Sequence, residues 1–226
     1  MRARKPRQRT LVFRTWGGKR RGAGRKPAPG TRAGVSHRPR EHQSANPAHV
    51  TVRLRDELPS LREPRLYLVV ESAIRAGNDR FGFRVVEFSA PGNHLHFIVE
   101  ADSAKALSRG MQGLLIRIAK AVNRALGRTG KVFKDRFHAR DLRTPTETRN
   151  CLVYVLNNAK HHMLANALSR DDVDPYSSAS WFSGWAGPIR SLRLEGPAPT
   201  VSPRTWLLRV GWRRRGLVRP SELPKS

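Results

Sequence analysis

The sequence predicts an α+β domain built on an antiparallel sheet, with two helices on one face of the sheet and a further helix after it. Segments that alternate apolar and polar residues, a pattern typical of strands, interleave with segments of helical periodicity in the order β-α-β-β-α-β. The turn sequence at 90–93, Ala-Pro-Gly-Asn, separates the two middle strands so narrowly that they should pair as a hairpin. This order and this hairpin are those of the ferredoxin-like sandwich.

Capping and periodicity set the expected bounds of these elements. Ser103 is a suitable N-cap for the longest helix, apolar residues recur along it at helical spacing, and Gly127 ends it. Either Thr144 or Thr146 caps the last helix, and the sequence leaves both open. In chain order we expect a strand at 49–55, a helix at 61–76, strands at 81–89 and 93–100, a helix at 103–126, a short strand at 136–142 and a last helix that runs to about 165.

The charge of the chain predicts a polyanionic partner. Its 226 residues carry 44 Lys and Arg against 17 Asp and Glu, a net charge of +27. Self-repulsion of that size is relieved when a polyanion neutralises it, and nucleic acid is the polyanion that gains most affinity in this way. An anionic membrane is the competitor, but the arginines do not line one face of an amphipathic helix and no apolar run approaches the ~20 residues that span a bilayer. We therefore expect no membrane partner.

The first 48 residues are expected to form a disordered, basic, DNA-binding arm. They hold 14 Lys and Arg and a single acid, Glu41. Few apolar residues are available there to offset the entropy of ordering. Within the arm, Arg25 and Lys26 belong to a Gly-Arg-Lys-Pro sequence that resembles the arginine–proline hooks of DNA minor grooves. A plain phosphate-binding tail is the alternative.

Residues 166–226 are expected to form a C-terminal extension rich in Trp and Arg, beyond a catalytic domain at 49–165. Its tryptophans should anchor it on the core rather than stack on bases; they are Trp181, Trp185, Trp206 and Trp212. The one cysteine, Cys151, lies in an apolar run and is expected to be a buried hydrophobe. With no disulfide to form, the chain suits a reducing cytosol.

Two histidines, His94 and His96, form a candidate metal site. Residues i and i+2 of a strand point to the same face, so both imidazoles should project side by side while Leu95 points the other way. Imidazole is a common ligand of divalent metals. Surface or core histidines are the ordinary alternative, but this pair follows a tight turn near a strand end, where a site can open.

Tyr154 and Asn158 form a second candidate constellation. Residues i and i+4 lie on one face of a helix, so the phenol and the amide should face the same way. A buried core tyrosine is the alternative. A phenol can also attack a phosphodiester and hold one end as a covalent ester, which keeps the bond energy for resealing.

Three motifs, taken together, resemble one family. His94-Leu95-His96 resembles the His-hydrophobic-His motif of the HUH nucleases. The segment 154–160, Tyr-Val-Leu-Asn-Asn-Ala-Lys, is similar to the tyrosine helix of single-tyrosine HUH transposases. Between them, the segment 132–137, Val-Phe-Lys-Asp-Arg-Phe, resembles the one that precedes that helix in REP-associated tyrosine transposases. The resemblance covers about residues 49–165. One departure is Ala159, where the family usually has proline.

The resemblance implies a transposase-like enzyme that nicks and rejoins single-stranded DNA containing a hairpin. It implies that Tyr154 is the nucleophile and forms a 5′-phosphotyrosine, and that Mg²⁺ or Mn²⁺ is bound by His94, His96 and Asn158. It also implies a bacterial cytoplasmic protein associated with the nucleoid. The oligomeric state stays open between a monomer and a homodimer.

A basic stretch before the last helix is expected to bind DNA, because cations interleaved with aromatics suit backbone contacts and base stacking. Its candidate residues are Lys131, Lys134, Arg136, Phe137, His138 and Arg140. A solvated loop is the alternative. For the whole chain, the rival hypothesis is a non-catalytic nucleic-acid-binding module, either a domesticated transposase or an RNA binder. A structural zinc protein is a poor third alternative, because one cysteine and scattered histidines do not make a closed four-ligand site.

Overall fold

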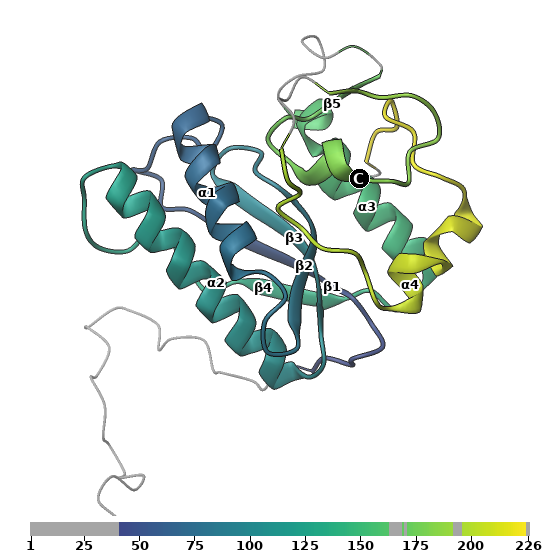
Figure 1. Cartoon of the computed structure of the whole chain (residues 1–226), viewed down its shortest axis with the longest axis horizontal. Coiled ribbons are helices and arrows are strands. Elements are labelled where there is room, and N and C mark those ends of the chain that lie inside the picture. The colour runs from purple at the N-terminus through teal and green to yellow at the C-terminus, as the bar shows by residue number, and fades with distance from the viewer. Residues whose placement is uncertain (1–40, 163–168, 170, 192–195, 225–226) are drawn as a thin grey trace, which may run out of the picture. The chain divides into compact units, whose positions relative to one another are not determined.

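The computed structural model describes residues 41–162, 169, 171–191 and 196–224 (Figure 1). Residues 1–40, which include Arg25 and Lys26 and most of the expected arm, lie outside the described part. None of the helices in the described part combines the length and the apolar character that crossing a bilayer would require.

The predicted order of elements is confirmed. The elements of the core are β1 (Ala48–Arg53), α1 (Pro64–Gly77), β2 (Phe83–Ser89), β3 (His94–Ala101), α2 (Ala104–Ala125), β4 (His138–Asp141) and α3 (Pro145–His162). The four strands form one antiparallel sheet in the order β2-β3-β1-β4, and β2 and β3 pair as the expected hairpin. The first strand of the chain, β1, is therefore central in the sheet. It pairs with the last strand, β4, which forms one edge.

The helices of the structure begin at residues that local sequence signals mark. Pro64 is the first residue of α1, where its missing N–H costs nothing. Ser103 Oγ accepts the backbone N–H of Ala106 at 3.1 Å and caps α2. Thr144, rather than Thr146, caps α3, because Thr144 Oγ1 accepts the N–H of Glu147 and the Glu147 carboxylate accepts the N–H of Arg143. This reciprocal pair resembles a capping box.

The sheet has a core on each face. On one face, Val50, Leu95 and Phe97 pack with buried residues of α1 and α2 such as Ile74 and Met111. On the other face, Val86 and Ile98 pack with Leu152, Val155 and Leu156 of α3. Figure 1 shows α1 and α2 on one side of the sheet and α3 on the other. The helix that bears Tyr154 therefore covers the face that α1 and α2 leave open.

The C-terminal extension completes the second core. It contains β5 (Asp172–Val173), η1 (Ser178–Trp181), β6 (Arg190–Ser191), α4 (Trp206–Arg209) and η2 (Gly211–Arg215). Trp212 is only 1% exposed and donates its Nε1–H to the Leu208 carbonyl, and Trp185 donates to the Ala179 carbonyl. These tryptophans anchor the segment as expected. Trp206 is an exception, since 48% of it is exposed.

The chain is ordered earlier than the expected boundary at residue 48. His42 Nδ1 lies 2.6 Å from Asp141 Oδ1, and its Nε2 lies 2.9 Å from the Ala101 carbonyl oxygen. The Gln43 N–H donates to Asp141 Oδ2 at 2.9 Å. These contacts tie the segment before β1 to the ends of β3 and β4. The expectation of disorder up to residue 48 was therefore wrong for residues 42–48, because a histidine and a backbone amide satisfy a carboxylate there.

Candidate active site on the α3 face of the sheet

Strand β3 points both of its histidines at α3. Leu95, Phe97 and Val99 belong to the core with α1 and α2, so the alternate residues His94 and His96 face the other way. Their ring centroids lie 6.2 Å apart and the rings are within 20° of parallel. His94 is partly exposed, whereas His96 is buried and lies 3.3 Å through Nδ1 from Thr51 Oγ1. The two histidines therefore lie on the face of the sheet that α3 covers, with His94 nearer to solvent than His96.

Helix α3 brings Tyr154 to this pair. Its buried side chains, including Leu152 and Leu156, fix the helix against the sheet. The Tyr154 ring meets the His96 ring edge-on, with centroids 5.2 Å apart and an angle of 85° between the planes. Tyr154 is half-buried, and burial, with Cys151 as the next cause, raises the pKa of its phenol above the ordinary value. The hydroxyl is therefore protonated at neutral pH.

A third histidine, His49 on β1, completes the cluster, and sequence reasoning missed it. Its ring stacks on His96 at 5.6 Å and meets Tyr154 edge-on at 5.7 Å. Burial, followed by the charges of Arg140 and His138, lowers the pKa of His49 to about 4. Its Nε2 is buried and has no hydrogen-bond partner among the residues described. Strand alternation in 49–53 places His49 on the other face of the strand from Val50 and Val52. Only the register between β1 and β3 shows which histidines lie together.

Strand β4 adds positive charge to the same face. His138 pairs with Thr51 and Arg140 pairs with His49 across the β1–β4 ladder, so these side chains share the face of the histidine cluster. Both are exposed. Of the residues expected to bind DNA, His138 and Arg140 are therefore the two that border the cluster.

The other residues of that basic stretch divide between surface and core. Lys131 and Arg136 are exposed. Lys134 is also exposed and forms a 2.8 Å ion pair with Asp56. Phe137 is only 8% exposed and belongs to the core with α1 and α2. Its expected role in base stacking was wrong, because it precedes β4 at a position that turns inward while His138 turns outward.

Asn158 lies one turn beyond Tyr154 and is 2% exposed. Its Oδ1 is buried and receives no hydrogen bond from any described residue, a costly state for an amide oxygen. Its neighbour Asn157 donates to the carbonyls of Arg219 and Glu222, and so faces the C-terminal extension, although its own Oδ1 also receives no hydrogen bond from the described residues. Ala159 stands where the family that the motifs resemble usually has proline. It lies within α3, which continues to His162.

The residues expected to bind a metal offer two ligand types that divalent ions accept, imidazole nitrogen from His94 and His96 and amide oxygen from Asn158. Two imidazoles from β3 and one buried amide oxygen without a hydrogen bond suit an ion that accepts both nitrogen and oxygen ligands. Within the described residues, no three His, Cys, Asp or Glu side chains are grouped to hold a metal. An amide ligand such as Asn158 would therefore have to complete the set.

Comparison with known proteins bears on the fold. No protein-family model and no curated protein matches the chain. Among solved structures, the chain is similar to a REP-associated tyrosine transposase bound to a REP hairpin, with a TM-score of 0.51 and 20% sequence identity. The match covers 65% of this chain and 84% of the other. At this identity the likeness shows a shared fold.

Proposed function

We propose that the chain is a transposase-like enzyme with a ferredoxin-like catalytic domain, which nicks and rejoins single-stranded DNA next to a hairpin through Tyr154. The observation that carries the proposal is the meeting of Tyr154 with the histidine pair. A phenol from α3 lies edge-on to His96 at 5.2 Å, although the two residues come from separate elements of the fold. A core tyrosine has no need of an H-x-H pair beside it. The likeness in fold to a hairpin-bound tyrosine transposase supports the same reading.

The reaction is a transesterification. The Tyr154 oxygen bonds to the phosphorus, the bond from phosphorus to the 3′ oxygen breaks, and the strand is left with a free 3′-OH and a 5′-phosphotyrosine. The phenol proton leaves as the bond forms, and the departing 3′ oxygen takes up a proton. Burial raises the pKa of Tyr154 above its ordinary value, so the phenol carries the proton that the reaction must remove. Attack by a free 3′-OH on the phosphotyrosine reverses the step and rejoins a strand.

His94, His96 and Asn158 would hold the Mg²⁺ or Mn²⁺ ion. The ion would supply charge to polarise the scissile phosphate and to stabilise the negative charge that develops there. His49 would act as a positioning residue, since its ring packs against both His96 and Tyr154. These contacts would help to set the distance between the phenol and His96.

His138 and Arg140 would bind the phosphates that enter the site, since both lie exposed on β4 beside the histidine cluster. Lys131, Lys134 and Arg136 would extend this contact, with Lys134 first giving up its pair with Asp56. The basic arm, including Arg25 and Lys26, would add contacts that do not depend on sequence.

A nicking assay tests the proposal. The full chain is incubated with Mn²⁺ or Mg²⁺ and labelled DNA hairpins whose single-stranded flanks are randomised, and cleaved strands are selected and sequenced. We expect cleavage by the wild type, and a loss of at least 100-fold for Tyr154→Phe, His94→Ala and His96→Ala with hairpin binding retained. Tyr67→Phe and Tyr176→Phe are matched controls, because each removes one phenol hydroxyl elsewhere, and both should cleave normally.

The same assay separates the rival function. A non-catalytic module, whether a domesticated transposase or an RNA binder, would bind hairpins with wild-type affinity and cleave none of the pool. The half-buried, protonated phenol is the observation that favours this rival. Binding without cleavage across the randomised pool, with either metal, would replace the enzyme by the binding module.

A further inference from the structure

Helix α2 carries positive charge along its whole length and no negative charge. Its 22 residues include five cations and no acid. All five are exposed: Lys105, Arg109, Arg117, Lys120 and Arg124. The closest acid along the chain is Asp102, before the first residue of the helix. At 1.5 Å per residue, the cations extend over about 28 Å of the helix axis.

The five α2 cations differ from several arginines elsewhere in the described part of the chain, which are paired with acids. Arg62, Arg149 and Arg190 are paired with Asp174, Glu222 and Asp172 respectively. Within the described residues, by contrast, none of the five α2 cations forms an ion pair. Their repulsion is thus balanced by no acid in that part of the chain, and an external anion would relieve it.

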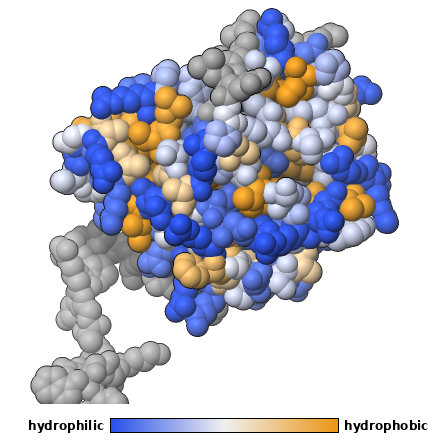
Figure 2. Space-filling view, viewed as in Figure 1, coloured by the Kyte–Doolittle hydropathy of each residue, from blue (hydrophilic) through white to orange (hydrophobic). Residues whose placement is uncertain are grey.

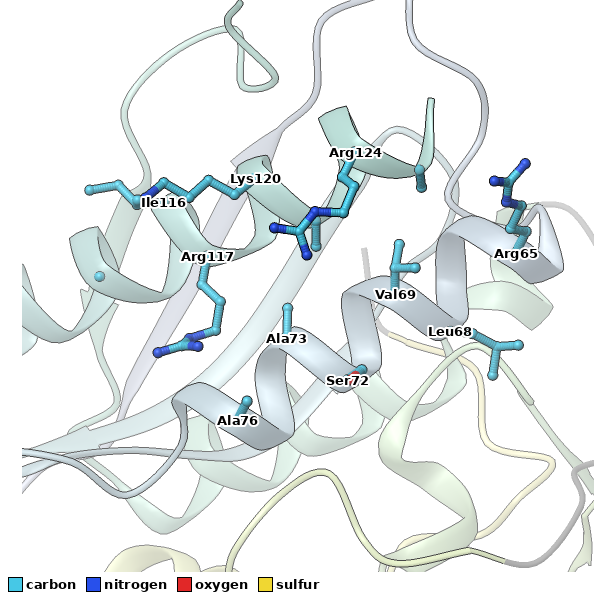
Figure 3. Close-up of a pocket in the computed structure, with 13 residues that line it drawn as sticks. Arg65, Leu68, Val69, Ser72, Ala73, Ala76, Ile116, Arg117, Lys120 and Arg124 are labelled. Atoms are coloured by element: carbon cyan, nitrogen blue, oxygen red, sulfur yellow. The ribbon is translucent and has the colours of Figure 1, made fainter. Parts of the chain in front are cut away.

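A groove of about 790 Å³ runs between α1 and α2 (Figure 3). Val69, Ala73 and Ala76 of α1 rise towards α2, and Arg117 and Arg124 reach from α2 over the groove. Arg65 and Lys120 complete a rim of four cations, and no acid lines the groove. The groove therefore has a floor of small apolar side chains and a positive rim.

A second hollow, of about 610 Å³, continues the first along α2. The two share Gly113 and Arg117, and the second adds Arg80, Lys105 and Arg109, again with no acid in its lining. Phe81 at its edge is 96% exposed. Figure 2 shows hydrophilic and apolar patches side by side over the part of the surface where α1 and α2 lie. The two hollows form one continuous surface, which we call the α2 surface.

We propose that the α2 surface binds the sugar–phosphate backbone of double-stranded DNA without regard to sequence. About 28 Å of cations is close to one turn of the duplex, about 34 Å, and far longer than a small anion. Small aliphatic side chains suit contact with sugars and offer no groups to read base edges. A second copy of the chain is an unsuitable occupant, because it carries the same charge.

The α2 surface and the histidine cluster lie on opposite sides of the sheet, since α1 and α2 cover one face and α3 the other (Figure 1). A duplex on α1 and α2 therefore leaves Tyr154 accessible to another strand. The protein would hold two DNA segments at once. This inference does not depend on whether Tyr154 cleaves DNA.

The salt dependence of duplex binding tests the proposal. A labelled, blunt 20-base-pair duplex with no single-stranded part is titrated with the full chain, and its dissociation constant is measured by fluorescence anisotropy at several salt concentrations. The test variant is Arg117→Gln, Lys120→Gln, Arg124→Gln. Each cation that contacts a phosphate contributes about 0.9 to the slope of log Kd against log salt, so we expect the slope to fall by about 2 to 3.

A control variant separates local contact from overall charge. Arg213→Gln, Arg214→Gln, Arg215→Gln also removes three exposed cations, but from η2 on the α3 side of the sheet. We expect its duplex slope to change by less than about 1. Equal losses in the two variants, or no loss in the α2 variant, would overturn the proposal.

Simultaneous binding is the second readout. Energy transfer between a donor-labelled hairpin and an acceptor-labelled duplex should appear with the wild type and disappear with the α2 variant, while hairpin binding persists. Stoichiometric displacement of the hairpin by the duplex would show that both DNAs bind one shared site and would contradict the proposal. An acidic peptide or an anionic vesicle that competes better than duplex DNA would do the same. Strand cleavage, measured separately, reports on Tyr154 alone.

Discussion

Trp212 belongs to the core that the C-terminal extension shares with α3, the helix that bears Tyr154, and its removal should cost several kcal/mol of stability. The ring is 1% exposed, donates Nε1–H to the Leu208 carbonyl at 2.9 Å and lies 5.6 Å from the Phe182 ring. A buried tryptophan removes ~150–250 Å² from water, which at about 25 cal/mol per Å² is worth about 4–6 kcal/mol. Large-to-small changes of buried aromatics cost about 3–5 kcal/mol. We expect Trp212→Ala to fall in that range.

Trp206→Ala is the matched control, since it makes the same truncation six residues earlier in the described extension. Trp206 is 48% exposed, so only about half of that transfer energy, about 2–3 kcal/mol, would be lost. Urea unfolding followed by circular dichroism measures both. Trp212→Phe should fall between them, which keeps the comparison usable if Trp212→Ala does not fold. Equal losses for the two alanine variants would refute the claim that the extension is part of the second core.

Three further predictions follow from buried groups and from the arm. Burial raises the pKa of Glu87 from its ordinary 4.5 to about 8, so the folded protein holds a proton that the unfolded chain releases. The free energy of unfolding should therefore fall as the pH rises from about 4.5 to 8, by at most about 1.4 kcal/mol per pH unit. Thermal melts of Glu87→Gln over the same pH range should lack this slope. An unchanged slope would mean that Glu87 is ionised in the folded protein. Cys151 is 5% exposed and burial raises its thiol pKa to about 12, so iodoacetamide should modify it only after urea unfolding, and rapid native labelling would contradict its burial. Deletion of residues 1–40 should weaken DNA binding and flatten its salt dependence, and an unchanged slope would remove the arm from the interface.

Much of the fold could be predicted because local signals agree with one another. Ser103, Gly127 and the alternation around His94 each act over a few residues, and the bounds of α2 and β3 follow from them within one residue. The first helix was expected from residue 61, three residues before its observed start at Pro64. The choice of Thr144 over Thr146 required the reciprocal contact with Glu147, which is made only once α3 has formed.

The parts of the site that could not be predicted depend on strand register. His49 joins the cluster because β1 lies between β3 and β4, a neighbourhood that residue periodicity does not specify. Phe137 looked like a stacking residue from its basic surroundings, but its place beside β4 turns it into the core. The ordering of His42 likewise rests on Asp141, 99 residues away.

The most direct test of the central claim is to locate the covalent bond between protein and DNA. The wild type is trapped on cleaved hairpin DNA with Mn²⁺, digested with nuclease and trypsin, and analysed by tandem mass spectrometry. The tryptic peptide 150–160 contains both Tyr154 and Cys151, so fragment ions distinguish the two nucleophiles. The account predicts a residual nucleotide phosphate on Tyr154 and none in Tyr154→Phe. A nucleotide on any other residue, or cleavage with no adduct, would contradict it.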